Sequence, residues 1–366
     1  MKVGFFSPLP PAATGVADYS AALITAMRRS GGGGDVIANA PGEVNLYHIG
    51  NNHLHREIHA RALAEPGVIV LHDAVLQHFY LGTLHEASYI SEFVYNYGEW
   101  SRGLAEDLWK NRARSASVTR YFEYPMLRRI AESAKAVVVH NPAAAAQVRK
   151  HAPSVRIEEI PHLFLNPPPV MPAETARLRS QLGLPPDALL AGVFGHLRES
   201  KRIQVILRVM ERLWAEGINW RLLVQGDFAS SDLERALATR LGDPRILRTG
   251  YLPEADFWRW ASAADLCLNL RYPSASETSG IAISMMGIGK PVVFTAGAEL
   301  DRIPENACLR IDSGPAEEEH LLGLLRWARQ NPAALKAIGR KAAEHITEKH
   351  APDQIAQRLW SVLKQV

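Results

Sequence analysis

The sequence predicts an α/β protein made of two doubly wound parallel-sheet domains that face a central cleft. Three observations lead to this fold class. The chain has 366 residues, and a domain takes roughly 150, so two domains are expected. Short β-branched runs alternate with segments of helical periodicity from end to end, which is the pattern of parallel sheets covered by helices on both faces. A run of prolines interrupts this alternation near the middle of the chain.

Composition and charge are those of an ordinary globular protein. Hydrophobic residues make up 47% and charged residues 22% of the chain, which excludes a disordered or disulfide-stapled class. Basic residues outnumber acids by 41 to 38, and a net charge of +3 gives no argument for a nucleic-acid partner. The only cysteines are Cys267 and Cys308, and Cys267 lies in an apolar run, so we expect a reducing, cytoplasmic compartment.

No segment of the sequence is predicted to cross a membrane. The chain contains no run of 18 apolar residues, and residues 1–8 are too short and too soon interrupted for a secretory signal. Peripheral contact with the inner face of a membrane through an amphipathic helix stays open, because it needs no spanning segment.

The first domain is predicted to span residues 1–165, and its strands are expected at 2–7, 44–49, 68–71, 136–139 and 155–160. Each of these runs is closed by a polar or helix-breaking residue. Residues 166–170 then contain three consecutive prolines, which lack amide donors and favour an extended connection. We therefore place the linker between the domains at 166–170.

The second domain is predicted to span residues 171–345, with strands at 189–194, 221–224, 246–249, 265–270 and 291–294. The helix after the first of these strands carries a buried stripe at helical spacing, formed by Ile203, Ile206, Leu207 and Met210. The last segment, residues 346–366, contains a helix that begins at Pro352 and has Ile355 and Leu359 on one face.

In the first domain, two loops that follow strands hold candidate site residues, because ligands of open parallel sheets bind there. Gly15 opens the first helix, whose amides and positive end suit a phosphate or sugar; a simple turn is the alternative. The Gly-x-Gly-x-x-Gly fingerprint of dinucleotide sites is absent. His72 and Asp73 follow a buried strand, although a lone histidine is usually structural. No histidine spacing indicates a zinc site, so no metal is expected.

In the second domain, the loop after the first strand is basic. Gly195 is followed by Arg198 and Lys201 at the start of a helix, where cations oppose the helix dipole. A bound diphosphate held by both side chains would explain them. An ion pair of Arg198 with Glu199 or another surface acid is the alternative.

The most informative stretch covers residues 273–293, where a polar loop with Glu277 leads through Ser279, Gly280 and Ile281 into a helix that ends before Pro291. This stretch, the Gly15 loop, His72-Asp73, the basic loop and the closing helix resemble the group 1 glycosyltransferases, family four. The resemblance covers nearly the whole chain. It implies the GT-B fold, with two Rossmann-like domains, and a closing helix that returns to the first domain.

The sequence departs from this family at two positions. Many members have a second glutamate eight residues after the first, where it contacts the nucleotide ribose, but the residue at that distance from Glu277 is Met285. His196 stands where many members carry arginine, which leaves Arg198 as its substitute. The Glu-Thr-Ser-Gly form, one residue shorter before Gly-Lys-Pro, indicates a divergent branch of the family.

The resemblance implies a retaining hexosyltransferase that moves a sugar from a UDP- or GDP-linked donor to a glycan, lipid-linked or small-molecule acceptor. Polysaccharide, glycan or glycolipid biosynthesis is the expected setting. Catalysis is assigned to His72, Arg198, Lys201 and Glu277, and binding of the nucleotide sugar to Gly15, Gly195, Lys201, Ser279, Gly280 and Ile281. Glu277 is expected to meet the transferred sugar, although an acid there could equally cap the helix. The absence of an Asp-x-Asp pair predicts metal-independent chemistry without a cofactor.

Two other functions stay open. A non-catalytic relative that binds sugar nucleotides or glycans would explain the missing second glutamate, and a GT-B epimerase or phosphorylase is the third candidate. Residues 80–124 combine aromatic side chains with cations. Most such aromatics belong to a core, but long excursions beside a cleft often carry specificity, so we expect this stretch to shape the acceptor side.

Overall fold

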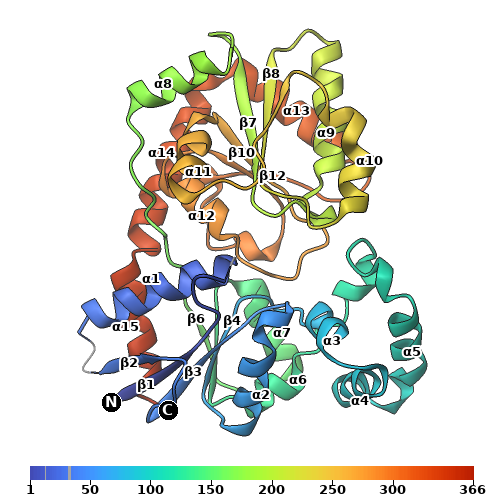
Figure 1. The fold of residues 1–366 in the computed structure, drawn as a ribbon, viewed down its shortest axis with the longest axis vertical. Coiled ribbons are helices and arrows are strands. Elements are labelled where there is room, and N and C mark those ends of the chain that lie inside the picture. The colour runs from blue at the N-terminus through green and yellow to red at the C-terminus, as the bar shows by residue number, and fades with distance from the viewer. Residues whose placement is uncertain (13, 32–33) are drawn as a thin grey trace.

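The computed structural model describes residues 1–12, 14–31 and 34–366. In this part of the chain, twelve strands form two six-stranded sheets in which all paired strands are parallel. The sheets lie in separate halves of an elongated molecule, with helices on both faces of each (Figure 1). The predicted fold class, two doubly wound domains, is confirmed.

The first sheet has the order β2-β1-β3-β4-β5-β6 and consists of β1 (Lys2–Phe6), β2 (Asp35–Ala38), β3 (Val44–Ile49), β4 (Val68–Leu71), β5 (Ala136–Val139) and β6 (Ile157–Glu159). The sequence analysis located five of these strands. It missed β2, an edge strand in which Val36 is the only buried residue, so the apolar signal was too short to detect.

The helices of the first half cover the two faces of this sheet unequally. One face carries α1 (Gly15–Arg29), and the other carries α2 (Arg56–Ala64), α3 (Gln77–Thr83), α4 (Glu86–Tyr97), α5 (Arg102–Lys110), α6 (Arg128–Ser133) and α7 (Pro142–His151). The α3–α5 segment extends sideways from the sheet (Figure 1). It belongs to the excursion that the sequence analysis singled out.

The second sheet has the order β12-β11-β10-β7-β8-β9 and consists of β7 (Leu189–Phe194), β8 (Trp220–Gln225), β9 (Ile246–Arg248), β10 (Leu266–Asn269), β11 (Val292–Thr295) and β12 (Leu309–Ile311). Its helices are α8 (Pro172–Gln181), α9 (Ile203–Ala215), α10 (Ser231–Leu241), α11 (Glu254–Ala263), α12 (Gly280–Gly287), α13 (Glu317–Gln330) and α14 (Pro332–Lys349). The edge strand β12, three residues long, was not anticipated.

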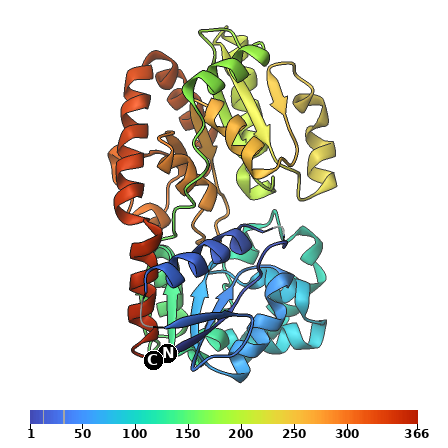
Figure 2. The same ribbon diagram turned by 60° about the vertical axis from the view of Figure 1, so that its left-hand side comes forward.

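The last helix, α15 (Pro352–Leu363), follows the second half in sequence but packs on the first. Ile355, Leu359 and Trp360 are buried in one cluster with α1, and the Trp360 indole N–H donates to the Met27 carbonyl at 3.1 Å. Figures 1 and 2 show α14 and α15 running down one side of the molecule, so that both chain ends lie together. No helix among the described residues is long and apolar enough to span a bilayer.

Candidate functional site

Loops from the two halves meet at the carboxyl ends of three strands. The amide of Ala74, just beyond β4, donates to the Ala275 carbonyl at 2.8 Å, and the Asn141 side chain, just beyond β5, donates to the Ser276 carbonyl at 2.9 Å. Ala275 and Ser276 belong to the loop between β10 and α12. Residues 274–279 make up most of this loop. The sequence analysis placed ligand binding at such strand ends, and the structure brings these particular ends into contact.

Glu277, at the centre of this β10–α12 loop, is held by two groups. Its Oε1 accepts from Arg271 Nη1 at 2.9 Å, and its Oε2 accepts from the Ala275 amide at 2.8 Å. The Ser274 hydroxyl lies 3.4 Å from Oε2 but donates its single proton to Glu299 Oε1 at 2.6 Å. Helix α12 is capped instead by Ser279, whose Oγ accepts from the Ala282 amide at 3.3 Å. The capping interpretation of Glu277 is therefore wrong: its carboxylate lies against the preceding residues and not over the helix end.

Lys201 is a buried cation beside this loop. Its ammonium donates to the Phe194 carbonyl, at the end of β7. Burial, and then the charges of Arg271 and Arg198, lower the pKa of Lys201 to about 7. Gly195, at a φ of +77°, leaves room for this amine, because a Cβ there would stand 3.3 Å from Lys201 Nζ. The same Cβ would lie 4.0 Å from Ile281, so the basic loop and the start of α12 are neighbours.

Arg198 and Arg202 differ in their surroundings. Arg198 is exposed, and within the described residues it forms no ion pair, with Glu199 or any other acid. Its charge lowers the pKa of Lys201 and of Asp73, on opposite sides of the interface. Arg202, by contrast, is bound to Glu317 and turned toward α13. Arg198 is thus the basic-loop arginine that faces the other half.

Arg271 is a site residue that sequence reasoning missed. It follows β10 by two residues, donates to Glu277 and also donates from Nη2 to the Ser279 hydroxyl at 3.2 Å. Its Nε is buried and has no protein partner. The available signal was its position beyond a buried strand, the same argument that selected His72. Arg271 adds a third cation to Lys201 and Arg198.

His72 lies in a buried cluster of aromatic rings in the first half. Its Nε2 is 3.0 Å from His48 Nδ1, and its ring centroid is 5.0 Å from that of Tyr19, which also contacts His140 and His162. Burial and the neighbouring histidines lower the pKa of His72 well below its usual value. His72 is therefore a neutral imidazole that is held by other side chains.

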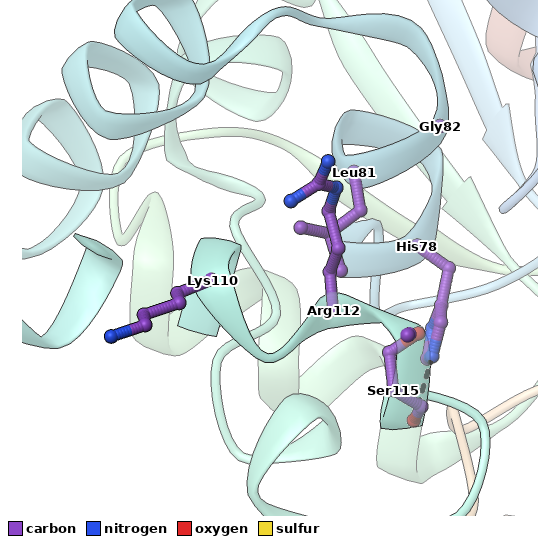
Figure 3. Close-up of a pocket in the computed structure, with 7 residues that line it drawn as sticks. His78, Leu81, Gly82, Lys110, Arg112 and Ser115 are labelled. Carbon is purple, nitrogen blue, oxygen red and sulfur yellow. Dashed lines mark hydrogen bonds between the residues drawn. The ribbon is translucent and has the colours of Figure 1, made fainter. Parts of the chain in front are cut away.

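Asp73 connects the interface to a surface pocket. Burial and the charge of Glu277 raise its pKa to about 6, and its Oδ2 accepts from the Asn51 amide at 2.8 Å. The Asn51 side chain lies 3.3 Å from His78 Nδ1, and His78 Nε2 donates to the Ser115 carbonyl at 3.1 Å. Hydrogen bonds thus run from Asp73 to a pocket of about 600 Å³ lined by His78, Leu81, Gly82, Lys110, Arg112, Ala113 and Ser115 (Figure 3).

The aromatic excursion around this pocket is mostly core. Tyr89 and Phe93 are buried, whereas Trp100 is 76% exposed. Arg112 lies over the Trp109 ring at 4.3 Å, and in Figure 3 its guanidinium points toward Leu81, while Lys110 extends the other way. Neither cation has an acidic partner within the described residues. The pocket therefore has an uncompensated positive rim.

The remaining candidate residues lie at the starts of two helices and within α12. Gly15 is exposed at the start of α1, and a Cβ there would meet open space. Gly280 opens α12, where a Cβ would stand 3.2 Å from the His162 ring. Met285 is fully buried, so nothing at that position replaces the missing acid. Within the part of the chain that the structure describes, no group of three or more His, Cys, Asp or Glu residues is arranged to hold a metal ion.

Comparison with known proteins gives the class first. Over its full length the chain is similar to sucrose-phosphate synthase from Thermosynechococcus elongatus, with a TM-score of 0.69, 18% identity and 98% of that chain covered. It is likewise similar to Anabaena HepE in complex with UDP-glucose, with a TM-score of 0.66, 14% identity and 100% of both chains covered. The protein therefore has the fold of the GT-B glycosyltransferases.

The sequence comparisons then give matches to one glycosyltransferase family over part of the chain. Residues 188–319 match the family model of the group 1 glycosyl transferases. The chain is also 28% identical over 221 residues to a D-inositol 3-phosphate glycosyltransferase of Streptomyces bingchenggensis. This alignment covers 54% of this chain and 46% of that protein. The match thus spans about half the length of this curated relative. The family match covers part of the second half of the chain, and over residues 188–319 it confirms the resemblance to the group 1 glycosyltransferases found in the sequence.

Proposed function

We propose that this protein is a retaining glycosyltransferase that moves a hexose from a nucleoside diphosphate sugar to an acceptor hydroxyl. The observation that carries the proposal is the gathering of Lys201, Arg198 and Arg271 beside the first turn of α12. Like charges around a buried amine disfavour its protonated form. A bound diphosphate would supply the opposite charge, together with acceptors for the free guanidinium and amide donors.

The donor diphosphate is proposed to bind Lys201, Arg198 and Arg271, with the amides of residues 279–281 at the positive end of α12. Gly15 and Gly195 let the chain approach the donor without side chains in the way. Cleavage of the glycosidic bond leaves negative charge on the departing phosphate. Preorganised cations stabilise the transition state, where that charge develops, more than they stabilise the bound donor, and this difference accelerates transfer.

Glu277 is proposed to accept hydrogen bonds from hydroxyls of the transferred sugar. Each carboxylate oxygen has two lone pairs, so the bonds from Arg271 and Ala275 leave acceptor capacity free. In the front-face mechanism implied by the family resemblance, the departing phosphate itself deprotonates the acceptor. No protein base and no metal ion are then required, and neutral His72 acts by its position near the reacting sugar.

The acceptor is proposed to approach from the first half, across Asp73 and the pocket at His78 and Arg112. The uncompensated cations on the pocket rim favour an acceptor with an anionic group, such as a phosphate or a carboxylate. Similar proteins include one in complex with UDP-glucose and a D-inositol 3-phosphate glycosyltransferase, which supports this pairing of donor and acceptor chemistry. We further propose that the donor is linked to UDP or GDP and that the protein acts in glycan, polysaccharide or glycolipid biosynthesis. Its proposed location is the cytoplasm, with contact at the inner face of the membrane.

Because Met285 is buried and is not an acid, a second candidate function is the binding of nucleotide sugars without catalysis. Thermal unfolding with a panel of UDP- and GDP-sugars tests donor binding, since a ligand at one hundred times its dissociation constant adds about 2.7 kcal/mol of stability. Release of free sugar or nucleoside diphosphate from the stabilising donor then separates an enzyme from a binding protein. Stabilisation by none of the panel would contradict the proposal.

A further inference from the structure

We propose that Asn141 is a positioning residue through which the first half of the molecule holds residues 274–279, which we call the donor loop, in their binding shape. The inference rests on the proposed function, because it concerns the orientation of Glu277. It means that use of the donor depends on a residue of the first half, outside the half proposed to bind the donor.

The Asn141 side chain forms hydrogen bonds with both halves of the molecule. Its Oδ1 accepts from the Ala144 amide at 2.9 Å and thereby caps α7. Its Nδ2 donates to the Ser276 carbonyl at 2.9 Å and to the Thr278 hydroxyl at 3.0 Å, both in the other half. Asn141 is only 3% exposed, so water cannot readily replace these partners. The cap fixes the amide group, and the fixed amide aims its N–H bonds at the donor loop.

The two residues that Asn141 binds flank Glu277 directly. Ser276 has a φ of +54°, a left-handed conformation that a non-glycine residue adopts at a cost and keeps only when its surroundings impose it. The bond to the Ser276 carbonyl, and that from Ala74 to the neighbouring Ala275 carbonyl at 2.8 Å, supply such a constraint. The Ala275 amide in turn donates to the Glu277 carboxylate. The backbone shape that orients Glu277 is thus set from the opposite half.

A simple capping role does not account for this arrangement. Asparagine, aspartate and serine cap helices about equally well, and capping uses only the side-chain oxygen. The amide nitrogen of Asn141 is the part that reaches across the interface. If the halves separated, the donor loop would lose these bonds, so we infer that the donor site is complete only while the halves are in contact.

Two variants separate the roles. Asn141→Asp keeps an oxygen for the cap but places an acceptor against the Ser276 carbonyl, and Asn141→Ser keeps a cap that is too short to cross the interface. Ser230→Ala is the matched control, because it removes the cap that α10 receives through the Leu233 amide, in a helix that contributes no residue to the site. UDP-glucose is the first donor probe, and GDP-mannose is the second.

For both Asn141 variants we expect the KM for the donor to rise at least about tenfold, the loss expected from two hydrogen bonds. Amide hydrogen exchange of residues 274–279 should accelerate without any donor present, whereas Ser230→Ala should change neither quantity. In a Glu277→Gln background, Asn141→Asp should lower kcat/KM for the donor much less than it does in the wild-type protein, because Asn141 acts through the orientation of the Glu277 carboxylate.

Three results would overturn the inference: unchanged exchange in the donor loop of both variants, an unchanged KM, or full additivity with Glu277→Gln. The exchange measurement needs no activity. If the wild-type protein used no nucleotide sugar, the proposed function would fail, while exchange would still decide whether Asn141 holds the loop.

Discussion

Donor binding should be coupled to proton uptake by Lys201. In the free protein, burial and two neighbouring arginines lower the pKa of this amine to about 7. A diphosphate placed against the amine favours its charged form, so the pKa rises in the complex. Binding therefore takes up the proton that the free amine lacks, about half a proton at pH 7 and about 0.9 at pH 8. Affinity should consequently fall as the pH rises, by about tenfold at pH 8 and about 100-fold at pH 9 relative to acidic solution.

Isothermal titration calorimetry with UDP-glucose, or GDP-mannose if that donor binds, measures this uptake when it is repeated in buffers of different ionisation enthalpy. The diphosphate of a nucleotide sugar does not itself titrate between pH 6 and 8.5. Lys201→Met should bind weakly and without proton uptake in this range, and Lys201→Arg should bind with a flat pH dependence, because arginine stays protonated. The reasoning is refuted if the wild-type protein takes up no proton at pH 8 or if the uptake persists in Lys201→Met.

Four further outcomes are expected. Glu277→Gln should lower turnover at saturating donor by about 100-fold with little change in melting temperature; full turnover would remove Glu277 from the donor site. Acid should destabilise the fold, because burial holds the pKa of His140 and His350 at about 4. The unfolded chain binds more protons than the folded chain below pH 6.5, so each such histidine removes about 1.4 kcal/mol of unfolding free energy per pH unit between 6.5 and 4. Equal urea midpoints at pH 7.5 and 5.5 would contradict this. Arg112→Gln should raise the KM of an anionic acceptor while donor hydrolysis stays unchanged, and the same KM in both proteins would exclude the pocket. Activity should survive a chelator, and recovery of an inactivated sample by magnesium or manganese would reveal a metal site.

The sequence predicted the central strands well because each is a short run rich in apolar residues. The strands at β3, β4, β5 and β7 have the predicted bounds. The edge strands β2 and β12 were missed, because an edge strand buries few side chains and its apolar signal is correspondingly short.

The candidate site was predictable where one loop holds the relevant residues, as for Lys201 and Arg198. It was not predictable where contacts join different strands. His48, His72, His140 and His162 are far apart in the sequence, yet they lie in or just beyond β3, β4, β5 and β6, which are consecutive in the sheet. Residue spacing cannot show such a cluster unless the strand order is known. The partners of Asn141, more than 130 positions away in sequence, were out of reach for the same reason.

The packing of α15 on α1 has a consequence for biosynthesis. Trp360 and its apolar neighbours complete one face of the first sheet, although nearly two hundred residues of the second half precede them in the chain. During translation, the first half therefore leaves the ribosome without part of its core. Its sheet face stays uncovered while the second half is made, and such exposed apolar surface favours aggregation. Folding of the first half can finish only after the last helix emerges, so a chain stopped before Pro352 should associate with chaperones or precipitate even though every residue of its first sheet is present.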